Sequence, residues 1–366
     1  MKQLFFLILI PLFCYSQKKI DLYENLNNNK VVTLSKVAKD VIYIPLETRE
    51  ECLLSNELQI IYTENFLFVG DLQNTKFYRF DNKGKFLNVL GHKGDGPEEF
   101  PSASFFFVDE ALQKVYVISP QSKALLKYDY DGRFCNKISL KESPWMIEKF
   151  NENLVMYNNR FNRISKDLNV KELFFFDDSG NILKSVPTTI VDKEMDMLLF
   201  EFPFFYRFND ELYYKNPLLD TVFLINKRME LEPSYIINTG PQHKRKDDYK
   251  NRNNYLRQIS IRNIYENDDF VFIIYAYQNE FRCLFVDKKT SEAVNAKDGY
   301  WGFTDDITNG PSLNPYWLSG SNQNILVSLL TSDDIKKQKD KFLNIKSVSM
   351  EWEEDNNPIV VIFVMR

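Results

Sequence analysis

Alanine, glycine and histidine are scarce in this chain of 366 residues. Only seven residues are alanine, and because alanine is the best helix former, this scarcity argues against a mostly helical protein. The 31 phenylalanines and 20 tyrosines favour β-strands instead. With 12 glycines, many turns must use asparagine or aspartate, whose side chains hydrogen-bond to the nearby backbone. The composition therefore predicts an all-β protein.

The shortage of histidine limits the chemistry that the chain can carry out. With only His92 and His243, it cannot build a three-histidine zinc site, and a histidine-dependent triad would need one of these two. The G-x-S-x-G and H-E-x-x-H motifs are also missing. A Ca²⁺ site built from oxygen ligands stays open, because asparagine and aspartate are abundant.

A strong net charge is missing as well. The formal net charge is −5, and no long run of like charges stands out. Nucleic-acid binding is therefore disfavoured.

The N-terminus has the pattern of an export signal. Lys2 precedes an apolar run at residues 4–13, and small residues before Gln17 allow cleavage after Ser16. Ten apolar residues are too few to cross a bilayer, and no other stretch approaches the required length of about 20. We expect residues 1–16 to be a signal peptide and the exported protein to be periplasmic, outer-surface or secreted. The alternative is a lipid anchor at Cys14, although Phe13 is larger than the residue that a lipoprotein signal peptidase prefers.

Three cysteines remain after the signal, namely Cys52, Cys135 and Cys283. No two of them have CxxC spacing, and an odd number cannot all pair. We expect them to be buried as small apolar residues. A disulfide between two of them stays open.

An internal repeat organises the rest of the chain. The pattern D-x-x-G follows an aromatic residue three times, and its glycines Gly84, Gly132 and Gly180 are spaced 48 residues apart. Degenerate copies begin at Asn226 and Asp287. Aspartate followed by glycine between apolar segments is typical of a hairpin turn.

A second repeated element is a polar tip followed by a short apolar strand. It occurs six times, with strands that start at residues 66, 115, 154, 212, 270 and 325. The intervals fit four short strands and their turns, so we predict one domain over residues 17–366, a six-bladed β-propeller of four-stranded antiparallel blades. Strands at residues 41–46 and 359–364 are expected to close the ring. One or two short helical insertions are expected, within residues 247–265 and at residues 332–343, where Ser332 is the predicted N-cap.

Three segments carry a resemblance to a known family, at residues 34–48, 91–101 and 357–361. They resemble the secreted bacterial six-bladed β-propeller family related to NHL repeats, and the second segment is similar to the NHL pattern G-x-x-G-x-G-x-x-E-F. The resemblance extends over essentially the whole mature chain. It implies an extracytoplasmic propeller that binds a ligand or partner, and it implies no established reaction.

The glycine-rich segment at residues 91–100 is the first candidate site. It lacks the Gly-Lys-Ser/Thr ending of a phosphate-binding loop and does not open a helix. At a propeller mouth, His92, Asp95, Glu98 and Glu99 would supply polar groups to a ligand. The alternative is a purely structural loop between strands.

The second candidate site lies within residues 300–317. Trp301 and Trp317 would offer flat rings for sugar or peptide recognition, and Asp305, Asp306 and Asn309 would offer hydrogen bonds. The alternative is that these aromatic residues pack between blades.

Together these features predict an exported, monomeric, non-enzymatic binding or scaffold propeller without a cofactor. It would recognise a glycan, peptide or protein partner through loops at one face. The alternative is an NHL-like or lactonase-like enzyme with Ca²⁺ in its central channel, which three or four converging carboxylate or asparagine oxygens would favour.

Overall fold

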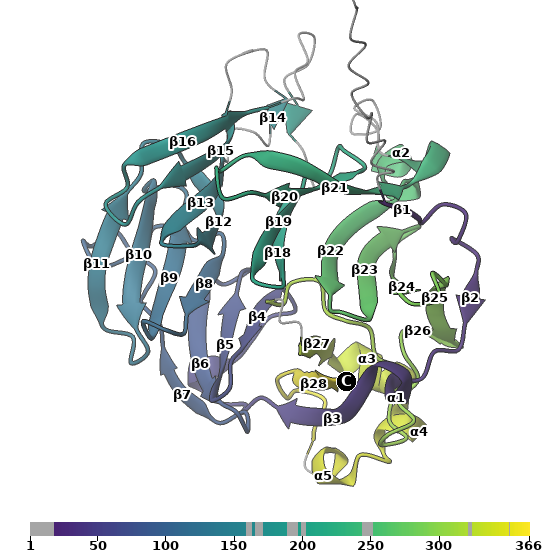
Figure 1. Cartoon of the computed structure of the whole chain (residues 1–366). Coiled ribbons are helices and arrows are strands. Elements are labelled where there is room, and N and C mark those ends of the chain that lie inside the picture. The colour runs from purple at the N-terminus through teal and green to yellow at the C-terminus, as the bar shows by residue number, and fades with distance from the viewer. Residues whose placement is uncertain are drawn as a thin grey trace, which may run out of the picture.

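The alternating apolar residues and polar turns fold into short strands that form six sheets around a central axis (Figure 1). The structure is a computed structural model that describes residues 18–158, 163–164, 171–188, 197–198, 203–243, 252–320, 324–350 and 352–366. The predicted signal peptide, with Cys14, lies outside these residues. The prediction of a six-bladed β-propeller is confirmed.

Five blades are regular antiparallel sheets, numbered here in chain order. From the inner to the outer strand, blade 1 contains β4 (Leu58–Tyr62), β5 (Phe66–Asp71), β6 (Lys76–Asp81) and β7 (Phe86–Val89), and blade 2 contains β8 (Phe106–Asp109), β9 (Lys114–Ser119), β10 (Ala124–Asp129) and β11 (Phe134–Ser139). Blade 3 contains β12 (Pro144–Phe150), β13 (Asn153–Asn158), β15 (Lys171–Phe176) and β16 (Ile182–Pro187), and blade 4 contains β18 (Phe204–Phe208), β19 (Glu211–Lys215), β20 (Thr221–Ile225) and β21 (Leu231–Asn238). Blade 5 contains β22 (Ser260–Glu266), β23 (Phe270–Tyr277), β24 (Glu280–Asp287) and β25 (Ala293–Asp298).

Five short strands add to this plan. β1 (Lys18–Asp21) and β2 (Asn29–Lys30) pair in parallel with the outer strands β21 and β25, β26 (Tyr300–Trp301) pairs with β25, and β14 (Arg163–Ile164) pairs with β17 (Met197–Leu198). The segment at the N-terminus of the described chain therefore runs along the outer edges of two blades.

Blade 6 closes the ring with both ends of the chain. Its strands are β27 (Ile325–Leu330), β28 (Ile359–Met365) and β3 (Ala38–Pro45), and β28 lies between the other two. Ile359 is paired with Pro45 and Ile362 with Ile42, in antiparallel register. The prediction that the terminal strands close the ring is confirmed. At the inner edge, where the other blades have a regular strand, Pro315 forms an isolated bridge to Ser328 and the Tyr316 N–H donates to the Val327 carbonyl at 2.7 Å.

The repeated D-x-x-G segments form the hairpins between the third and fourth strands of blades 1 to 3. In blade 1, the Asp81 carboxylate accepts hydrogen bonds from the Lys83 and Lys85 N–H groups, both at 2.9 Å. The three glycines have φ values of +81° to +87°, a conformation that strains other residues. In blades 4 and 5 the corresponding positive φ values fall on Met229 and Ser291.

The same three glycines lie against the outer strand of the preceding blade. A Cβ atom on them would lie 2.0 to 2.4 Å from a backbone carbonyl oxygen of that strand. The pairs of glycine and carbonyl residue are Gly84 with Pro45, Gly132 with Val89, and Gly180 with Ser139. The hairpins therefore dock blade onto blade at a distance that excludes any side chain.

Apolar clusters fill the spaces between blades. One cluster joins Val360 and Ile362 of β28 to Ile60 and Val69 of blade 1. Strands of a propeller bury both faces in this way, so each blade depends on its two neighbours.

The helices are short, and their described number exceeds the one or two that were predicted. They are α1 (Leu34–Val37), α2 (Arg252–Arg257), α3 (Ser332–Lys337), α4 (Lys339–Phe342) and α5 (Lys346–Ser349), with 3-10 turns η1 (Glu50–Cys52) and η3 (Gly240–Gln242). Thr331, rather than Ser332, caps α3, because its hydroxyl and Asp334 form a reciprocal capping box. No helix in the described part of the chain has the length and apolar character needed to cross a bilayer.

Two of the three cysteines are buried as predicted. Cys52 and Cys283 lie in the core, whereas Cys135 is exposed, so the prediction was wrong for Cys135. The reason is its place on β11, the outer strand of blade 2, where one face meets solvent. All three are free thiols.

A buried carboxyl group lies between blades 3 and 4. Glu172 on β15 is only 3 % exposed, and its Oε1 accepts hydrogen bonds from the Tyr214 hydroxyl and from Asn216 Nδ2, the latter at 2.6 Å. Burial raises the pKa of Glu172, although these hydrogen bonds oppose the shift. The folded protein therefore holds this proton to a higher pH than the unfolded chain does.

We predict that the D-x-x-G hairpins tolerate no side chain at their glycine, which Gly132→Ala tests against Gly299→Ala. Both glycines have positive φ, but a Cβ atom on Gly299 meets nothing within 4 Å, whereas one on Gly132 meets the Val89 carbonyl oxygen at 2.3 Å. Gly132→Ala should therefore lose about 2 kcal/mol more free energy of unfolding than Gly299→Ala, measured by urea denaturation. Equal losses would show that the docking distance does not constrain the hairpin.

The buried carboxyl group predicts a pH dependence of stability. Because the folded-state pKa of Glu172 is raised, the stability that its protonated form contributes is present below the unfolded pKa and is lost as the pH rises through the folded pKa. Glu172→Gln keeps an acceptor for Tyr214 and Asn216 but does not titrate. Between the unfolded and the folded pKa, the wild type should therefore lose stability relative to Glu172→Gln. The difference between their free energies of unfolding should shift in favour of the variant by about 1.4 kcal/mol for each pH unit. The exposed Glu152→Gln is the control, and a pH profile of Glu172→Gln parallel to that of the wild type would contradict the prediction.

Candidate functional site: the central channel

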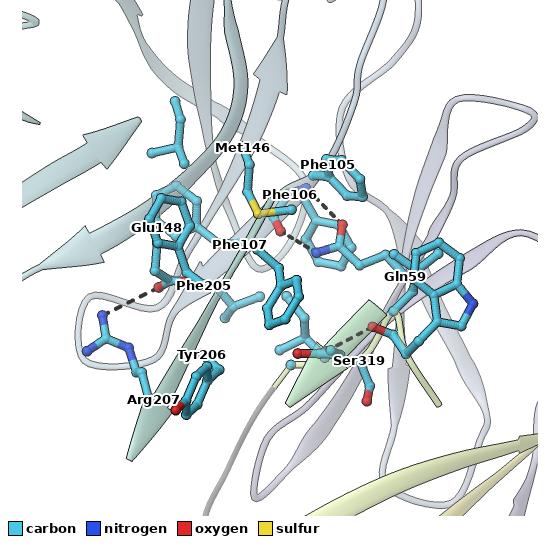
Figure 2. A pocket seen from close by; sticks show the side chains of 18 of the residues that line it. Gln59, Phe105, Phe106, Phe107, Met146, Glu148, Phe205, Tyr206, Arg207 and Ser319 are labelled. Carbon is cyan, nitrogen blue, oxygen red and sulfur yellow. Dashed lines mark hydrogen bonds and ion pairs between the residues drawn. The ribbon is translucent and has the colours of Figure 1, made fainter. Parts of the chain in front are cut away.

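A cavity of about 330 Å³ lies in the central channel, where the inner strands of the blades meet. Strands β4, β8, β12, β18 and β22 line it, and residues 317–320 complete the wall on the side of blade 6. Figure 2 shows side chains from these different blades facing one space. Below, this space is called the channel cavity.

Aromatic side chains form much of its wall. Phe107 and Phe205 come from blades 2 and 4, and Trp317 comes from the segment before β27. The Trp317 ring stacks on Phe281, with ring centroids 6.2 Å apart and an interplanar angle of 13°. The Arg262 guanidinium lies 5.8 Å from the Trp317 ring, a cation–π distance.

Several polar groups of the wall are engaged in holding it together. Gln59 donates to the Phe106 carbonyl at 2.9 Å and accepts from the Phe106 N–H at 3.0 Å, which ties blade 1 to blade 2 (Figure 2). Asn263 Nδ2 donates to the Trp317 carbonyl at 2.9 Å. The Ser319 hydroxyl lies 2.6 Å from the Tyr265 hydroxyl and donates to the Tyr316 carbonyl at 2.8 Å.

Charged groups from neighbouring blades also meet in the channel cavity. Glu148 of β12 and Arg207 of β18 form an ion pair with 3.5 Å between Oε1 and the guanidinium nitrogen (Figure 2). Glu110 lies just beyond β8, and desolvation together with the charge of Glu64 raises its pKa. The cavity thus combines an aromatic wall with a small number of charges, the usual composition of a ligand site.

The donor set of this cavity does not fit Ca²⁺. Its two carboxylates are Glu110 and Glu148, and the second is paired with Arg207. Over the described residues of the whole chain, no three histidine, cysteine, aspartate or glutamate side chains are placed to hold a metal ion. Ca²⁺ takes six to eight oxygen ligands at about 2.3 to 2.6 Å, which this arrangement does not offer.

The four candidate residues of the glycine-rich segment lie outside the channel cavity. This loop joins β7 to β8 and closes on itself, since Glu99 accepts from the Gly96 N–H at 3.0 Å. The His92 carbonyl accepts from the Phe100 N–H at 3.2 Å, and the Glu98 carbonyl accepts from the Tyr128 hydroxyl at 2.7 Å. The side chains of His92, Asp95 and Glu98 are exposed.

The second candidate group is divided by the fold. Trp317 lines the channel cavity, whereas the Trp301 ring lies 4.3 Å from the Arg282 guanidinium and 4.1 Å from Lys297 Nζ. The Asn309 carbonyl accepts from Asn344 Nδ2 at 2.8 Å. The two tryptophans therefore do not form one surface with the polar residues between them.

The two aspartates of this group hold the N-terminal segment in place. The buried Asp305 accepts from the Tyr43 hydroxyl at 2.7 Å, and Asp306 accepts from the Ser35 N–H at 2.9 Å and from the Ser35 hydroxyl. Burial, with the Asp305 charge beside it, raises the pKa of Tyr43 well above its usual range.

The sequence interpretation missed most of the cavity residues, including Phe107, Glu148, Phe205, Arg207 and Arg262. One signal could have found them. The strand that precedes each of the first five counted polar tips is the innermost strand of its blade, and it supplies channel residues such as Glu148, Arg207 and Arg262.

Comparison with known proteins agrees with the fold. The family described as "Domain of unknown function (DUF4934)" matches residues 17–364. Among curated proteins, none matches the chain.

Solved structures with the same architecture are distant in sequence. A putative exported protein from Bacteroides fragilis has a TM-score of 0.70 at 20 % identity, covering 95 % of this chain and 99 % of its own. A member of the DUF4221 family from Bacteroides vulgatus has a TM-score of 0.56 at 12 % identity, covering 90 % of this chain and 97 % of its own. At these identities the similarity shows the fold alone.

The contacts of Asp305 predict a structural role that Asp305→Ala tests. Its carboxylate accepts hydrogen bonds from the Tyr43 hydroxyl, from the Ile307 and Thr308 N–H groups and from the Thr308 hydroxyl. Removing it leaves these donors without their partner, so we expect a loss of about 3 kcal/mol in the free energy of unfolding. The exposed Asp95→Ala should stay within about 0.5 kcal/mol of the wild type. Equal stability of the two variants would contradict this role.

Proposed function

This chain belongs to the DUF4934 family, and we propose that it is an exported binding protein that takes a peptide segment of a partner into its channel cavity. The observation that carries this proposal is the composition of the cavity, whose wall combines Phe107, Phe205 and Trp317 with the Glu148–Arg207 ion pair. A peptide offers apolar side chains for the rings and polar or charged groups for the pair. The cavity volume of about 330 Å³ is at the lower end of ligand sites and suits a short segment.

The position of these two charges supports binding of a ligand inside the central channel of the propeller. Glu148 and Arg207 belong to different blades and are each about one-third exposed, so a bound group can compete for either partner. An exposed pair of this kind contributes little to stability, commonly about 0 to 1 kcal/mol. Its members can therefore be used for recognition at a small cost to the fold.

The chemistry of the wall favours binding over catalysis. The cavity lining contains neither histidine nor cysteine among the described residues, and the Ser319 hydroxyl is bonded to Tyr265 and to a carbonyl rather than to a base. A serine nucleophile needs an adjacent base to be activated.

The proposal includes the predicted export. Residues 1–16 would be removed as a signal peptide, or the chain would be anchored by a lipid on Cys14. The similarity to a Bacteroides fragilis protein described as a putative exported protein supports export. A mass measurement on the mature protein would distinguish cleavage after Ser16 from a lipid on Cys14.

The channel proposal is tested with peptides selected from a random phage-displayed library against purified protein of residues 17–366. Trp317→Leu and Glu148→Gln should each weaken the selected peptides at least about 10-fold in Kd, measured by isothermal titration calorimetry. Trp301→Leu is the matched control, because its ring lies outside the channel cavity, and its Kd should stay within about two-fold.

Each variant is compared by its melting temperature, so that misfolding is separated from loss of binding. The proposal is overturned if the library yields no peptide, or if the selected peptides bind Trp317→Leu and Glu148→Gln as tightly as the wild type.

A further inference from the structure

One mouth of the central channel carries a negative charge from each of five blades. Because blades 1 to 5 repeat one strand order around the axis, the C-terminal ends of their inner strands lie at the same mouth (Figure 1). Within two residues after each of these strands, the chain has an exposed carboxylate. These five side chains, called the tip carboxylates, are Glu64, Glu110, Glu152, Asp210 and Asp268.

Basic residues do not balance these charges within the same turns. The turns that join the inner strand to the second strand in blades 1 to 5 contain neither lysine nor arginine. In the sequence, the polar tip that precedes β27 is Asn-Gln-Asn at residues 322–324 and carries no charge. A channel mouth with one sign of charge focuses the electric field and attracts ligands of the opposite sign. This mouth therefore favours a cationic ligand.

Glu110 is the tip carboxylate that also lines the channel cavity. Because its side chain is exposed, the cavity reaches the mouth at this residue. Desolvation, together with the charge of Glu64, raises the pKa of Glu110. Among the described residues, no lysine or arginine forms an ion pair with either carboxylate. A cation bound beside them would therefore relieve a repulsion between like charges.

The cations on the neighbouring inner strands are already paired. Lys149 of β12 pairs with Asp109, the residue before Glu110, and Arg207 of β18 pairs with Glu148 at 3.5 Å. These pairs hold blade 2 to blade 3 and blade 3 to blade 4. A cation for Glu110 would therefore have to come from a ligand.

We propose that Glu110 selects peptides with a lysine or arginine side chain, which it binds at the mouth of the channel cavity. This inference rests on the proposed peptide-binding function and adds the charge class of the peptide. Ile61 of β4 and Val108 of β8 also line the cavity, and they offer apolar surface on which the methylene stem of the basic side chain can pack. The other tip carboxylates attract the cation over about 8 Å at physiological salt.

A basic side chain fits this mouth better than a metal ion does. Over the described residues, no three histidine, cysteine, aspartate or glutamate side chains are placed to hold a metal ion. The tip carboxylates come from separate blades and act as separate charges. A lysine or arginine can pair with one carboxylate, whereas Ca²⁺ needs about six to eight oxygen ligands at once.

The test uses the peptides selected from the random library against purified protein of residues 17–366. We expect the selected sequences to share a lysine or arginine. Replacing this lysine by norleucine, or this arginine by citrulline, should raise the Kd at least about five-fold in titration calorimetry, because the charge is lost. Glu110→Gln should weaken the unmodified peptide by a similar factor.

A double-mutant cycle separates the proposed pair from other effects. The neutral peptide should bind Glu110→Gln and the wild type within about two-fold, because each change removes the same interaction. Added salt should weaken the wild-type complex more than the Glu110→Gln complex. Glu98→Gln is the matched control, since Glu98 is exposed and lies outside the channel cavity, and its Kd for the unmodified peptide should stay within about two-fold of the wild type.

The inference is overturned if the selected peptides share no basic residue, or if Glu110→Gln binds them as tightly as the wild type does. Either result leaves the proposed function standing as long as Trp317→Leu weakens the same peptides. A library that yields no peptide overturns both.

Discussion

The pairing of β28 with β3 is the contact on which the rest of the molecule depends. These strands come from opposite ends of the chain and pair from Ile359 with Pro45 to Val364 with Asp40. Without this pairing, blades 5 and 1 would each lose the neighbour that covers one apolar face, and residues such as Ile60 and Phe272 would meet solvent. The channel cavity needs the same closure, because its wall includes residues of blade 1 and residues 317–320, which precede blade 6.

Around the ring, the sequence repeat corresponds to a repeat of docking contacts. Gly84, Gly132 and Gly180 recur because each hairpin approaches a carbonyl of the preceding blade more closely than a Cβ atom allows. Blades 4 and 5 replace the glycine by Met229 and Ser291, which keep the positive φ at a higher conformational cost. The glycine signal is lost in this half of the chain, whereas the strand order within blades 4 and 5 is the same as in blades 1 to 3.

The fold could be predicted from the sequence because its signals are local. The strand after a polar tip and the hairpin at D-x-x-G depend on neighbouring residues, and the apolar residues 359–364 had to find a partner strand. The site could not be predicted in the same way. Trp301 and Trp317 are close in sequence, but β26 directs the first toward Arg282 while the second lies in the channel. The pairing of Glu148 with Arg207 depends on two blades meeting at the axis, which no spacing along the chain encodes.

Ligand binding in the channel cavity is coupled to the stability of the ring, because the inner strands of different blades form its wall. The channel cavity is assembled from every blade, and Gln59 and Asn263 hold its wall together while facing it. Changes there act on the joints between blades as well as on a ligand.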